Sequence, residues 1–228
     1  MLSCQHLPSR PWYSPGASLE HPVDSLSVQV EPIPIRVLGP LTVTAADGES
    51  VDVGPRKLVE LLVILTAERV PRSADHLAEL LWRGSPPRSV AVTLQGYISR
   101  LRKALAAVDG VRIDTVTTGY VLRCDGSGTD LDVLERLSTD GLRLARTDPA
   151  AAAETLCRAL DLWRGPPLGE VADIAEMAPE ITRLEQMRAD LTESAAETLL
   201  TTGEHRRAVT LLSDLLRHQP YREGAVRV

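Results

Sequence analysis

The chain of 228 residues is 43% hydrophobic and 25% charged, which suits one large or two ordinary soluble domains. No apolar run reaches the ~18 residues of a membrane span, and prolines interrupt the start, so we expect a cytoplasmic protein with no membrane partner and no signal peptide. Three distant cysteines and five histidines without metal-ligand spacing exclude a disulfide framework and predict no metal and no cofactor.

The net charge of −6 conceals an uneven distribution of charge along the chain. Residues 1–128 carry 13 basic and 13 acidic side chains, whereas residues 129–228 carry 12 basic and 18 acidic ones. No acid lies between Glu79 and Asp109. A local excess of positive charge attracts anions even in an acidic protein, so this stretch is a candidate binding surface. Its basic residues are Arg83, Arg88, Arg100, Arg102 and Lys103.

The chain begins with a proline-rich arm and continues in short strands. Residues 1–33 hold five prolines among Ser, Gly and His, which is typical of a disordered arm. Apolar residues then alternate on both sides of Gly39-Pro40 and predict two strands, and a turn at Asp47-Gly48 leads to a third. The alternating residues are Ile35 and Val37, Leu41 and Val43, and Val51 and Val53.

Three helices follow, each marked by a start signal or by its apolar spacing. The first opens with Pro55 at its first helical position, and leucines recur behind it at helical spacing. Ser73 caps the second helix, which ends at Trp82. The stretch Arg83–Pro87 is a loop by composition, and the third helix runs from Ser89 to Ala107. Its apolar face consists of Val90, Leu94, Ile98, Leu101 and Leu105.

A terminal hairpin completes this first domain. Alternation over Val111–Val116, a turn at Thr118-Gly119 and a return over Tyr120–Leu122 predict its two strands. The order of strands, three helices and hairpin over residues 34–125 predicts an α+β N-terminal winged helix-turn-helix whose third helix is basic. The alternative is a generic α+β domain without a role on DNA.

Residues 130–228 have the pattern of an all-α domain that follows a junction at Gly126–Thr129. Predicted amphipathic helices cover Asp130–Ala145, Pro149–Trp163, Pro179–Thr202 and Glu204–His218. The last two show the spacing of a tetratricopeptide repeat, in Ala196, Gly203-Glu204, Ala208, Leu212, Leu215 and Pro220. Plain helical hairpins are the alternative, and in both cases stacked helix pairs present a groove.

The third predicted helix carries side chains suited to the major groove of DNA. Gln95 and Arg100 lie outside its apolar stripe, and their side chains can pair bidentately with adenine and guanine. Hydroxyl groups on the same helix suit phosphate oxygens, which position a protein without specifying sequence. The candidates for the DNA backbone are Thr93, Tyr97 and Ser99, with Arg88 near the helix start and Tyr120 at the hairpin tip.

Four segments of the chain strongly resemble one family of regulators. They are LLWRGSPPRSVAVTLQGYISRLRKAL from Leu80, TTGYVL from Thr117, ALDLWRGPPLGEV from Ala159 and LLRHQPYRE from Leu215. The first two resemble the DNA-binding domain of the Streptomyces antibiotic regulatory protein (SARP) family, which is itself similar to OmpR/PhoB-type domains. The last two resemble the bacterial transcriptional activation domain that follows it in that family.

The resemblance implies a transcriptional activator of a secondary-metabolite (antibiotic) biosynthetic gene cluster, located at the nucleoid. Such regulators bind double-stranded DNA at direct repeats overlapping the promoter −35 region and contact RNA polymerase, including its sigma factor. Direct repeats imply a head-to-tail pair on DNA. The resemblance assigns base contacts to Gln95 and Arg100, backbone contacts to Thr93, Tyr97, Ser99 and Tyr120, and a further phosphate contact to Lys57. It assigns polymerase contacts to Trp82, Arg83, Ser85 and Arg88.

The chain departs from the family pattern in two places. The hairpin turn carries Thr117 and Thr118 where response-regulator wings often carry arginine. We therefore expect weaker DNA binding by the hairpin and a larger contribution from the third helix. Family members also continue for some tens of residues beyond the position of Val228. We therefore expect a C-terminally incomplete activation domain, in a truncated product or a fragment of a longer regulator.

Two other classes of function compete with this interpretation. An enzyme is not expected, because the chain has no phosphate-binding GxxxxGK[ST] or GxGxxG motif and no GxSxG nucleophile motif. An adaptor acting through a tetratricopeptide-like domain, or a truncated competitor that binds without activating, is the alternative. The combination of Gln95 and Arg100 on a basic helix favours the DNA-binding regulator.

Overall fold

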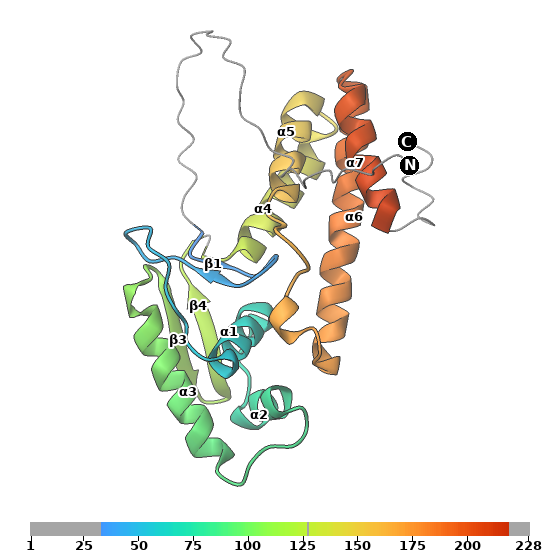
Figure 1. The fold of residues 1–228 in the computed structure, drawn as a ribbon. Helices are drawn as coiled ribbons and strands as arrows, with labels where there is room; N and C mark the ends of the chain where they lie inside the picture. Colours follow the sequence, from blue (N-terminus) through green and yellow to red (C-terminus); the bar gives the residue numbers. More distant parts are fainter. Residues whose placement is uncertain (1–32, 127, 219–228) are drawn as a thin grey trace, which may run out of the picture. The chain divides into compact units, whose positions relative to one another are not determined.

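The computed structural model describes residues 33–126 and 128–218. The predicted arm up to residue 32, and Pro220 of the repeat signature, lie outside the described residues. The protein is mostly helical with two small antiparallel sheets (Figure 1). Its first half contains β1 Ile35–Arg36, β2 Thr42–Val43, α1 Arg56–Glu68, α2 Ala74–Trp82, α3 Val90–Ala104, the 3-10 helix η1 Leu105–Ala107, β3 Val111–Val116 and β4 Gly119–Cys124.

The first two predicted strands form a short antiparallel pair, but the third prediction was wrong. β1 and β2 pair with Ile35 opposite Val43. The amide of Val51 donates to the carbonyl of Val43 at 2.8 Å, yet Val51–Val53 does not continue as a strand. The carboxylate of Asp52 accepts from the amide of Gly54 at 2.8 Å, so a local turn replaces the ladder before α1.

Local signals set the starts and ends of the next two helices. Pro55 is the extended residue before α1 rather than its first helical residue, which corrects the predicted start by one position. The hydroxyl of Ser73 accepts from the amide of His76 at 3.1 Å and caps α2, as predicted. α2 ends at Trp82, also as predicted, and Arg83 terminates it in the left-handed conformation at φ 51°.

The third helix packs one face into the core and leaves the other to solvent. Leu94, Ile98 and Leu101 are buried, at the spacing that the sequence predicts. The α-helix ends at Ala104, and η1 accounts for the last residues of the predicted span. The rings of Trp82 and Tyr97 stack with centroids 6.0 Å apart and planes 8° apart, and this contact joins α2 to α3.

The hairpin docks against Arg72, which comes just before Ser73, the cap of α2. Its two-residue turn is Thr117-Thr118 rather than the predicted Thr118-Gly119, because Gly119 already pairs with Val116. Arg72 and Tyr120 exchange two backbone hydrogen bonds of 2.9 Å. At Gly119, with φ at 137°, a Cβ would lie 1.9 Å from the carbonyl oxygen of Arg72, so only glycine permits this approach.

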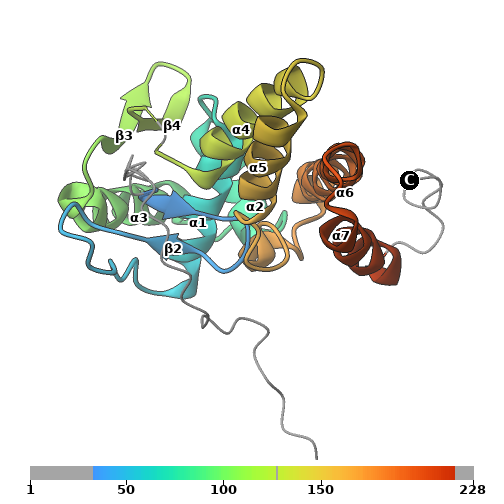
Figure 2. The same cartoon turned by 90° about the horizontal axis from the view of Figure 1, so that it is seen from above.

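The second half consists of helices in which each packs against the next (Figures 1 and 2). Its elements are α4 Asp130–Leu144, α5 Pro149–Leu160, the 3-10 helices η2 Gly169–Val171 and η3 Ala175–Met177, α6 Ala178–Thr201 and α7 His205–His218. α5 ends at Leu160 and not at the predicted Trp163. The amides of Leu162 and Trp163 donate to carbonyls three residues earlier, as in a 3-10 helix, so the α-helical pattern stops there. Ala196 and Ala208, the small residues of the predicted repeat, lie in one apolar cluster with Ala153, Leu199 and Leu212.

The two halves, residues 33–126 and 128–218, share one hydrophobic core. A single cluster of buried side chains runs from β1 and α1–α3 to α4, η2 and α6. The amides of Val37 and Leu38 donate to the buried carboxylate of Asp130 at 2.8–3.0 Å. On the other side of this segment, the amides of Arg164 and Leu168 donate to the carbonyls of Leu38 and Val37. The chain after β1 is therefore held between α4 and the segment that follows α5.

Candidate nucleic-acid interface

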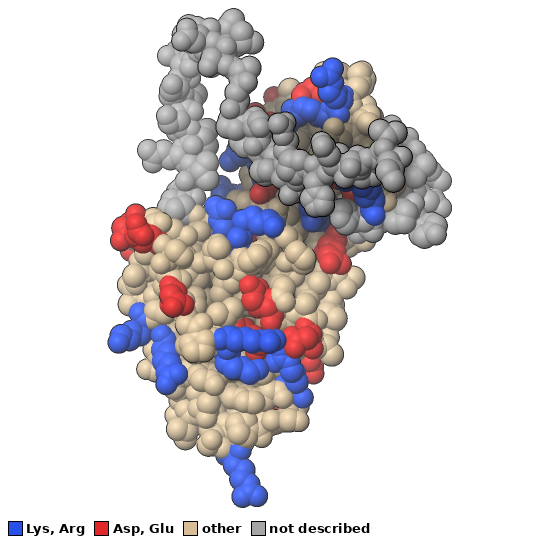
Figure 3. All heavy atoms as spheres, viewed as in Figure 1, with Lys and Arg blue, Asp and Glu red and all other residues tan. Residues whose placement is uncertain are grey.

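The solvent face of α3 presents the base-reading candidates without internal partners. Gln95, Ser99 and Arg100 are exposed, and α3 contains no acidic residue. Within residues 33–126 and 128–218, the side chains of Gln95, Arg100 and Arg88 form no hydrogen bond or ion pair. At the lower end of α3 and the loop before it, the charged side chains visible in Figure 3 are basic. This face is free to meet an anionic ligand.

Two of the predicted backbone-contacting residues also have structural roles inside the domain. Thr93 is half-buried, and its hydroxyl donates to the carbonyl of Ser89 at 3.0 Å. Tyr97 is half-buried because its ring stacks on that of Trp82. Any contact of these side chains with DNA would use the remaining exposed atoms. Ser99, by contrast, is exposed, as is Arg88 near the start of the helix.

Arg102 connects the basic helix to the hairpin. Its guanidinium donates to the carbonyl of Ile113 at 2.8 Å and to the hydroxyl of Thr115 at 2.7 Å. The sequence placed Arg102 among the solvent-facing basic residues, because nothing local marks a hydrogen bond to a strand that follows in the chain. The contact fixes the angle between α3 and β3, so Arg102 positions the hairpin rather than adding free charge.

The hairpin offers less to a ligand than the sequence suggested. Tyr120 is half-buried and pairs with Thr115 close to the exposed turn Thr117-Thr118, and its backbone is bridged to Arg72. Tyr120 thus lies near the hairpin tip, as predicted, but its side chain is only partly exposed. The exposed arginines of the hairpin form ion pairs with its own acids, Arg112 with Asp114 and Asp125, and Arg123 with Asp114.

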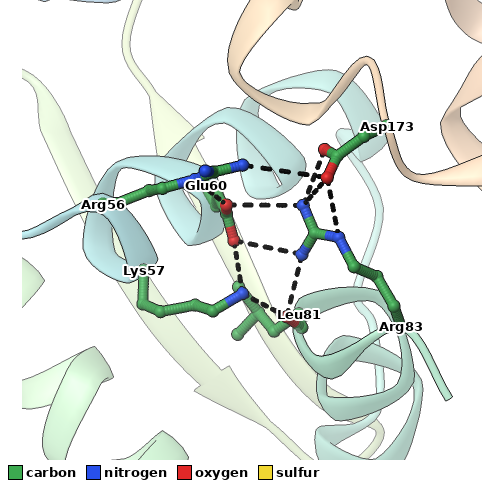
Figure 4. A network of polar contacts seen from close by, with 6 residues as sticks. All are labelled: Arg56, Lys57, Glu60, Leu81, Arg83 and Asp173. Carbon is green, nitrogen blue, oxygen red and sulfur yellow. Dashed lines mark hydrogen bonds and ion pairs between the residues drawn. The ribbon is translucent and has the colours of Figure 1, made fainter. Parts of the chain in front are cut away.

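Lys57 and Arg83, two further predicted contacts, converge on one buried carboxylate (Figure 4). Glu60 of α1 is fully buried, and its oxygens lie 2.8 Å from Lys57 Nζ and 3.4 Å from two Arg83 nitrogens. Arg56 contacts the same carboxylate at 2.7 Å. Lys57 also donates to the carbonyl of Leu81 at the end of α2. We call Arg56, Lys57, Glu60, Arg83 and Asp173 the Glu60 network.

The Glu60 network reaches the second half of the chain through Asp173. Arg83 donates to Asp173 in a bidentate pair, with contacts of 2.6–3.0 Å, across 90 residues of sequence. Burial alone raises the pKa of Glu60, but hydrogen bonds from Lys57, Arg56 and Arg83 outweigh it and hold the pKa below its usual value. The hydrogen bond from Arg83 likewise lowers the pKa of Asp173. The positive charges of Lys57 and Arg83 are thus compensated inside the protein.

The loop between α2 and α3 keeps two of its predicted contact residues free. Ser85 and Arg88 are exposed, whereas Trp82 is half-buried in its stack with Tyr97 and the Arg83 side chain is 30% exposed. At the start of α3, Ser89 provides no side-chain cap, unlike Ser73, Thr129 and Asp148 at the starts of other helices. The amide of Val90 donates to the carbonyl of Pro87 at 3.0 Å instead, so the first turn of α3 begins with a backbone contact and not with a side-chain cap.

The described residues contain no grouping of three or more His, Cys, Asp or Glu side chains that could hold a metal ion. None of the helices in residues 33–126 and 128–218 is both long enough and apolar enough to cross a bilayer. Burial raises the pKa of the Cys124 thiol to about 12 and also raises that of Cys157, so neither is a ready nucleophile.

Comparison with known proteins identifies the family. A family model described as the bacterial transcriptional activator domain matches residues 129–228. Regulatory protein DnrI of Streptomyces peucetius is 35% identical over 202 residues, which cover 83% of this chain and 73% of DnrI. The chain belongs to the SARP family. It is therefore a member of a family of transcription regulators and not of a family of enzymes.

Two further relatives match this chain over only about half of their own length. Transcriptional regulator RedD of Streptomyces coelicolor is 28% identical over 198 residues, covering 84% of this chain and 56% of RedD. The solved structure of Mycobacterium tuberculosis EmbR, in complex with a low-affinity phosphopeptide, has a TM-score of 0.77 at 29% identity. It covers 84% of this chain and 52% of the EmbR chain, so this SARP chain spans about half the length of both RedD and EmbR.

Proposed function

We propose that this SARP-family chain is a sequence-specific DNA-binding transcriptional activator. In this proposal, residues 34–125 act as an OmpR/PhoB-type winged helix-turn-helix, and α3 enters the major groove. The observation that carries it is the acid-free outer face of α3, on which Gln95 and Arg100 stand exposed without internal partners. Family membership supports the regulatory role, since the relatives DnrI and RedD are a regulatory protein and a transcriptional regulator.

The proposed contacts divide into those that read bases and those that hold phosphates. Arg100 would pair bidentately with guanine, and Gln95 with adenine. Ser99 and Arg88 would contact phosphates, which adds affinity without sequence discrimination. Thr93, Tyr97 and Lys57 would contribute less than the sequence suggested, since their polar atoms or rings already have partners inside the protein. Tyr120 would also contribute less, because its side chain packs partly against the core.

Substitution of Arg100 tests the base-reading role. Arg100→Ala is expected to lose about 1–3 kcal/mol of binding free energy on the specific duplex and less on random DNA, because a bidentate base contact carries discrimination. Arg88→Ala, the matched change at a proposed phosphate contact, should weaken binding to both duplexes by similar factors. Fluorescence anisotropy titrations at two salt concentrations measure both effects. Equal losses for Arg100→Ala on the two duplexes would reduce Arg100 to a phosphate contact.

We further propose that two copies bind direct repeats near the −35 region as a head-to-tail pair. A single α3 reads few base pairs, the hairpin arginines are paired with acids, and residues 129–228 carry an excess of acid, so one copy should bind weakly. Two copies whose helices face one side of the duplex require repeats about one turn, ~10–11 bp, apart.

A spacing series tests the paired arrangement. Inserting half a turn, ~5 bp, between the repeats is expected to abolish cooperative binding, and a full-turn insertion should restore part of it. Cooperativity is measured from titrations of duplexes with one and with two repeats at each spacing. The same affinity at every spacing would mean that each copy binds alone.

The activating role is proposed to depend on RNA polymerase, including its sigma factor. The exposed loop residues Ser85 and Arg88 lie beside the start of α3, where a neighbouring polymerase on the promoter can reach them. Arg83 is the weaker candidate, because Glu60 and Asp173 already hold its guanidinium. Transcription with purified polymerase separates the outcomes, since a protein that binds the promoter without raising transcript yield would be a competitor and not an activator. The proposed targets are secondary-metabolite gene clusters.

A further inference from the structure

The outer face of α3 carries an exposed apolar side chain beside a glycine, within the basic surface. Val92 is 73% exposed, more than any other large hydrophobic residue in the described part of the chain. Gly96 stands one helical turn further on the same face, and Leu94 and Ile98 point to the opposite side. An isolated exposed valine needs no explanation on an ordinary helix. Here it coincides with a second unusual feature at the adjacent turn.

Nothing inside the protein requires glycine at position 96. Its backbone is ordinary α-helix, and a Cβ built there would meet no atom within 4 Å. Glycine within a helix lowers stability relative to alanine, so neither conformation nor internal packing explains the residue. The remaining physical use of a missing side chain is the close approach of another molecule to the backbone.

The charges around Val92 and Gly96 indicate what approaches. Arg88, Arg100 and Lys103 flank this face, and the segment from Leu80 to Val108 contains no acid. An apolar protein partner would need a wider hydrophobic patch, whereas Val92 is surrounded by polar and cationic residues. The major groove of DNA offers phosphates for the cations and one apolar group on its floor, the C5-methyl of thymine.

We propose that Val92 reads a thymine methyl group in the major groove, and that Gly96 allows the helix backbone to approach close enough for this contact. The inference rests on the proposed function, because it requires α3 to lie in the groove. It adds a specificity-determining residue to Gln95 and Arg100, and it predicts a thymine in each half-site opposite the first turn of α3, where recognition helices touch base edges.

Replacing thymine by uracil tests the contact, because it removes the methyl group and leaves all hydrogen bonds intact. The probe is the duplex that the full chain selects from a randomised DNA pool, with each thymine changed singly to deoxyuridine. At one position per half-site, wild-type affinity should fall about fourfold, the effect of one buried methyl group. Val92→Ala should lose a similar factor on the unmodified duplex and become insensitive to deoxyuridine at that position.

Two further variants make the result specific. Val209→Ala, the same change at an exposed valine of α7, should bind like the wild type. Gly96→Ala should keep or raise the melting temperature, since the added methyl meets open space, yet weaken DNA binding about tenfold by overlap with the duplex. A loss of binding without a loss of stability separates contact with DNA from a folding defect.

The outcomes also separate this inference from the proposed function. Normal binding with no deoxyuridine position coupled to Val92→Ala would overturn thymine reading and leave the regulator intact. Wild-type affinity in Gly96→Ala would overturn the close approach. If the wild-type chain selects no sequence from the pool, the proposed function fails, and the inference fails with it.

Discussion

Asp130→Ala is expected to destabilise the chain by about 2–5 kcal/mol. The carboxylate is fully buried and accepts the amides of Val37 and Leu38, and each buried amide left without an acceptor costs about 1–3 kcal/mol. The loss should appear as a lower midpoint in urea unfolding followed by far-ultraviolet circular dichroism. Because Asp130 joins α4 to the segment after β1, both halves of the chain should be affected together.

The matched control for this prediction lies on the same helix. Asp140 is partly exposed and pairs with Arg143 at 3.4 Å, so Asp140→Ala should change stability by about 0.5 kcal/mol or less. Burial raises the pKa of Asp130 above its usual value even though hydrogen bonds from the amides of Leu38 and Val37 oppose it, and asparagine would keep an acceptor oxygen for these amides. Asp130→Asn should therefore be milder than Asp130→Ala. Wild-type stability in Asp130→Ala would show that the two amides find other acceptors.

Local chemistry made most helices predictable from the sequence. These signals act over a few residues, and the structure places them as expected. They are the Ser73 cap, the apolar spacing of Leu94, Ile98 and Leu101, and the small residues Ala196 and Ala208. The prediction of a third strand was wrong for an equally local reason. The alternating apolar pattern over Val51–Val53 does not reveal that the Asp52 carboxylate accepts from the amide of Gly54 and forms a turn. The same pattern fits a strand and an extended entry to a helix.

The side-chain contacts of the candidate interface were harder to predict because their partners are distant in sequence. Arg83 and Asp173 are 90 residues apart, and the composition of the loop after α2 indicated a solvated arginine. Arg102 and Tyr120 likewise form contacts that exist only after the hairpin docks, with Ile113 and Arg72 respectively. The sequence of one helix or strand alone does not reveal such contacts. Gln95 and Arg100 were easier, because a helix face opposite a buried stripe is exposed by geometry alone.

The shared core also bears on how the two halves of the chain act together. The sequence predicted a junction between two domains at Gly126–Thr129. In the structure, Glu60, Arg83 and Asp173 connect α1, the loop before α3 and the segment between η2 and η3. The loop that presents Ser85 and Arg88 therefore starts from a residue held by both halves. The second half of the chain therefore helps to set the position of this loop, and a truncation that removes residues 129–228 would also remove the Asp173 contact of Arg83.

Replacing Glu60 by glutamine should reveal this network through its pH dependence. At pH 7, Glu60→Gln is expected to lower the free energy of unfolding by about 1–3 kcal/mol, because a buried site keeps its cations but loses the charge they pair with. The pKa of Glu60 lies below its ordinary value of 4.5, so its contribution is present above pH 4.5 and is lost as the pH falls through the folded-state pKa. Urea unfolding between pH 7 and pH 3 measures the difference.

The two proteins should therefore converge in acid. As wild-type Glu60 becomes protonated, it offers the same neutral oxygen as glutamine, and the stability gap to Glu60→Gln should close toward pH 3. Glu49 is an exposed glutamate, and Glu49→Gln should follow the wild type at every pH. A gap that stays constant from pH 7 to pH 3 would assign the effect of Glu60→Gln to altered packing, and the ion pairs with Lys57, Arg56 and Arg83 would then add nothing to stability.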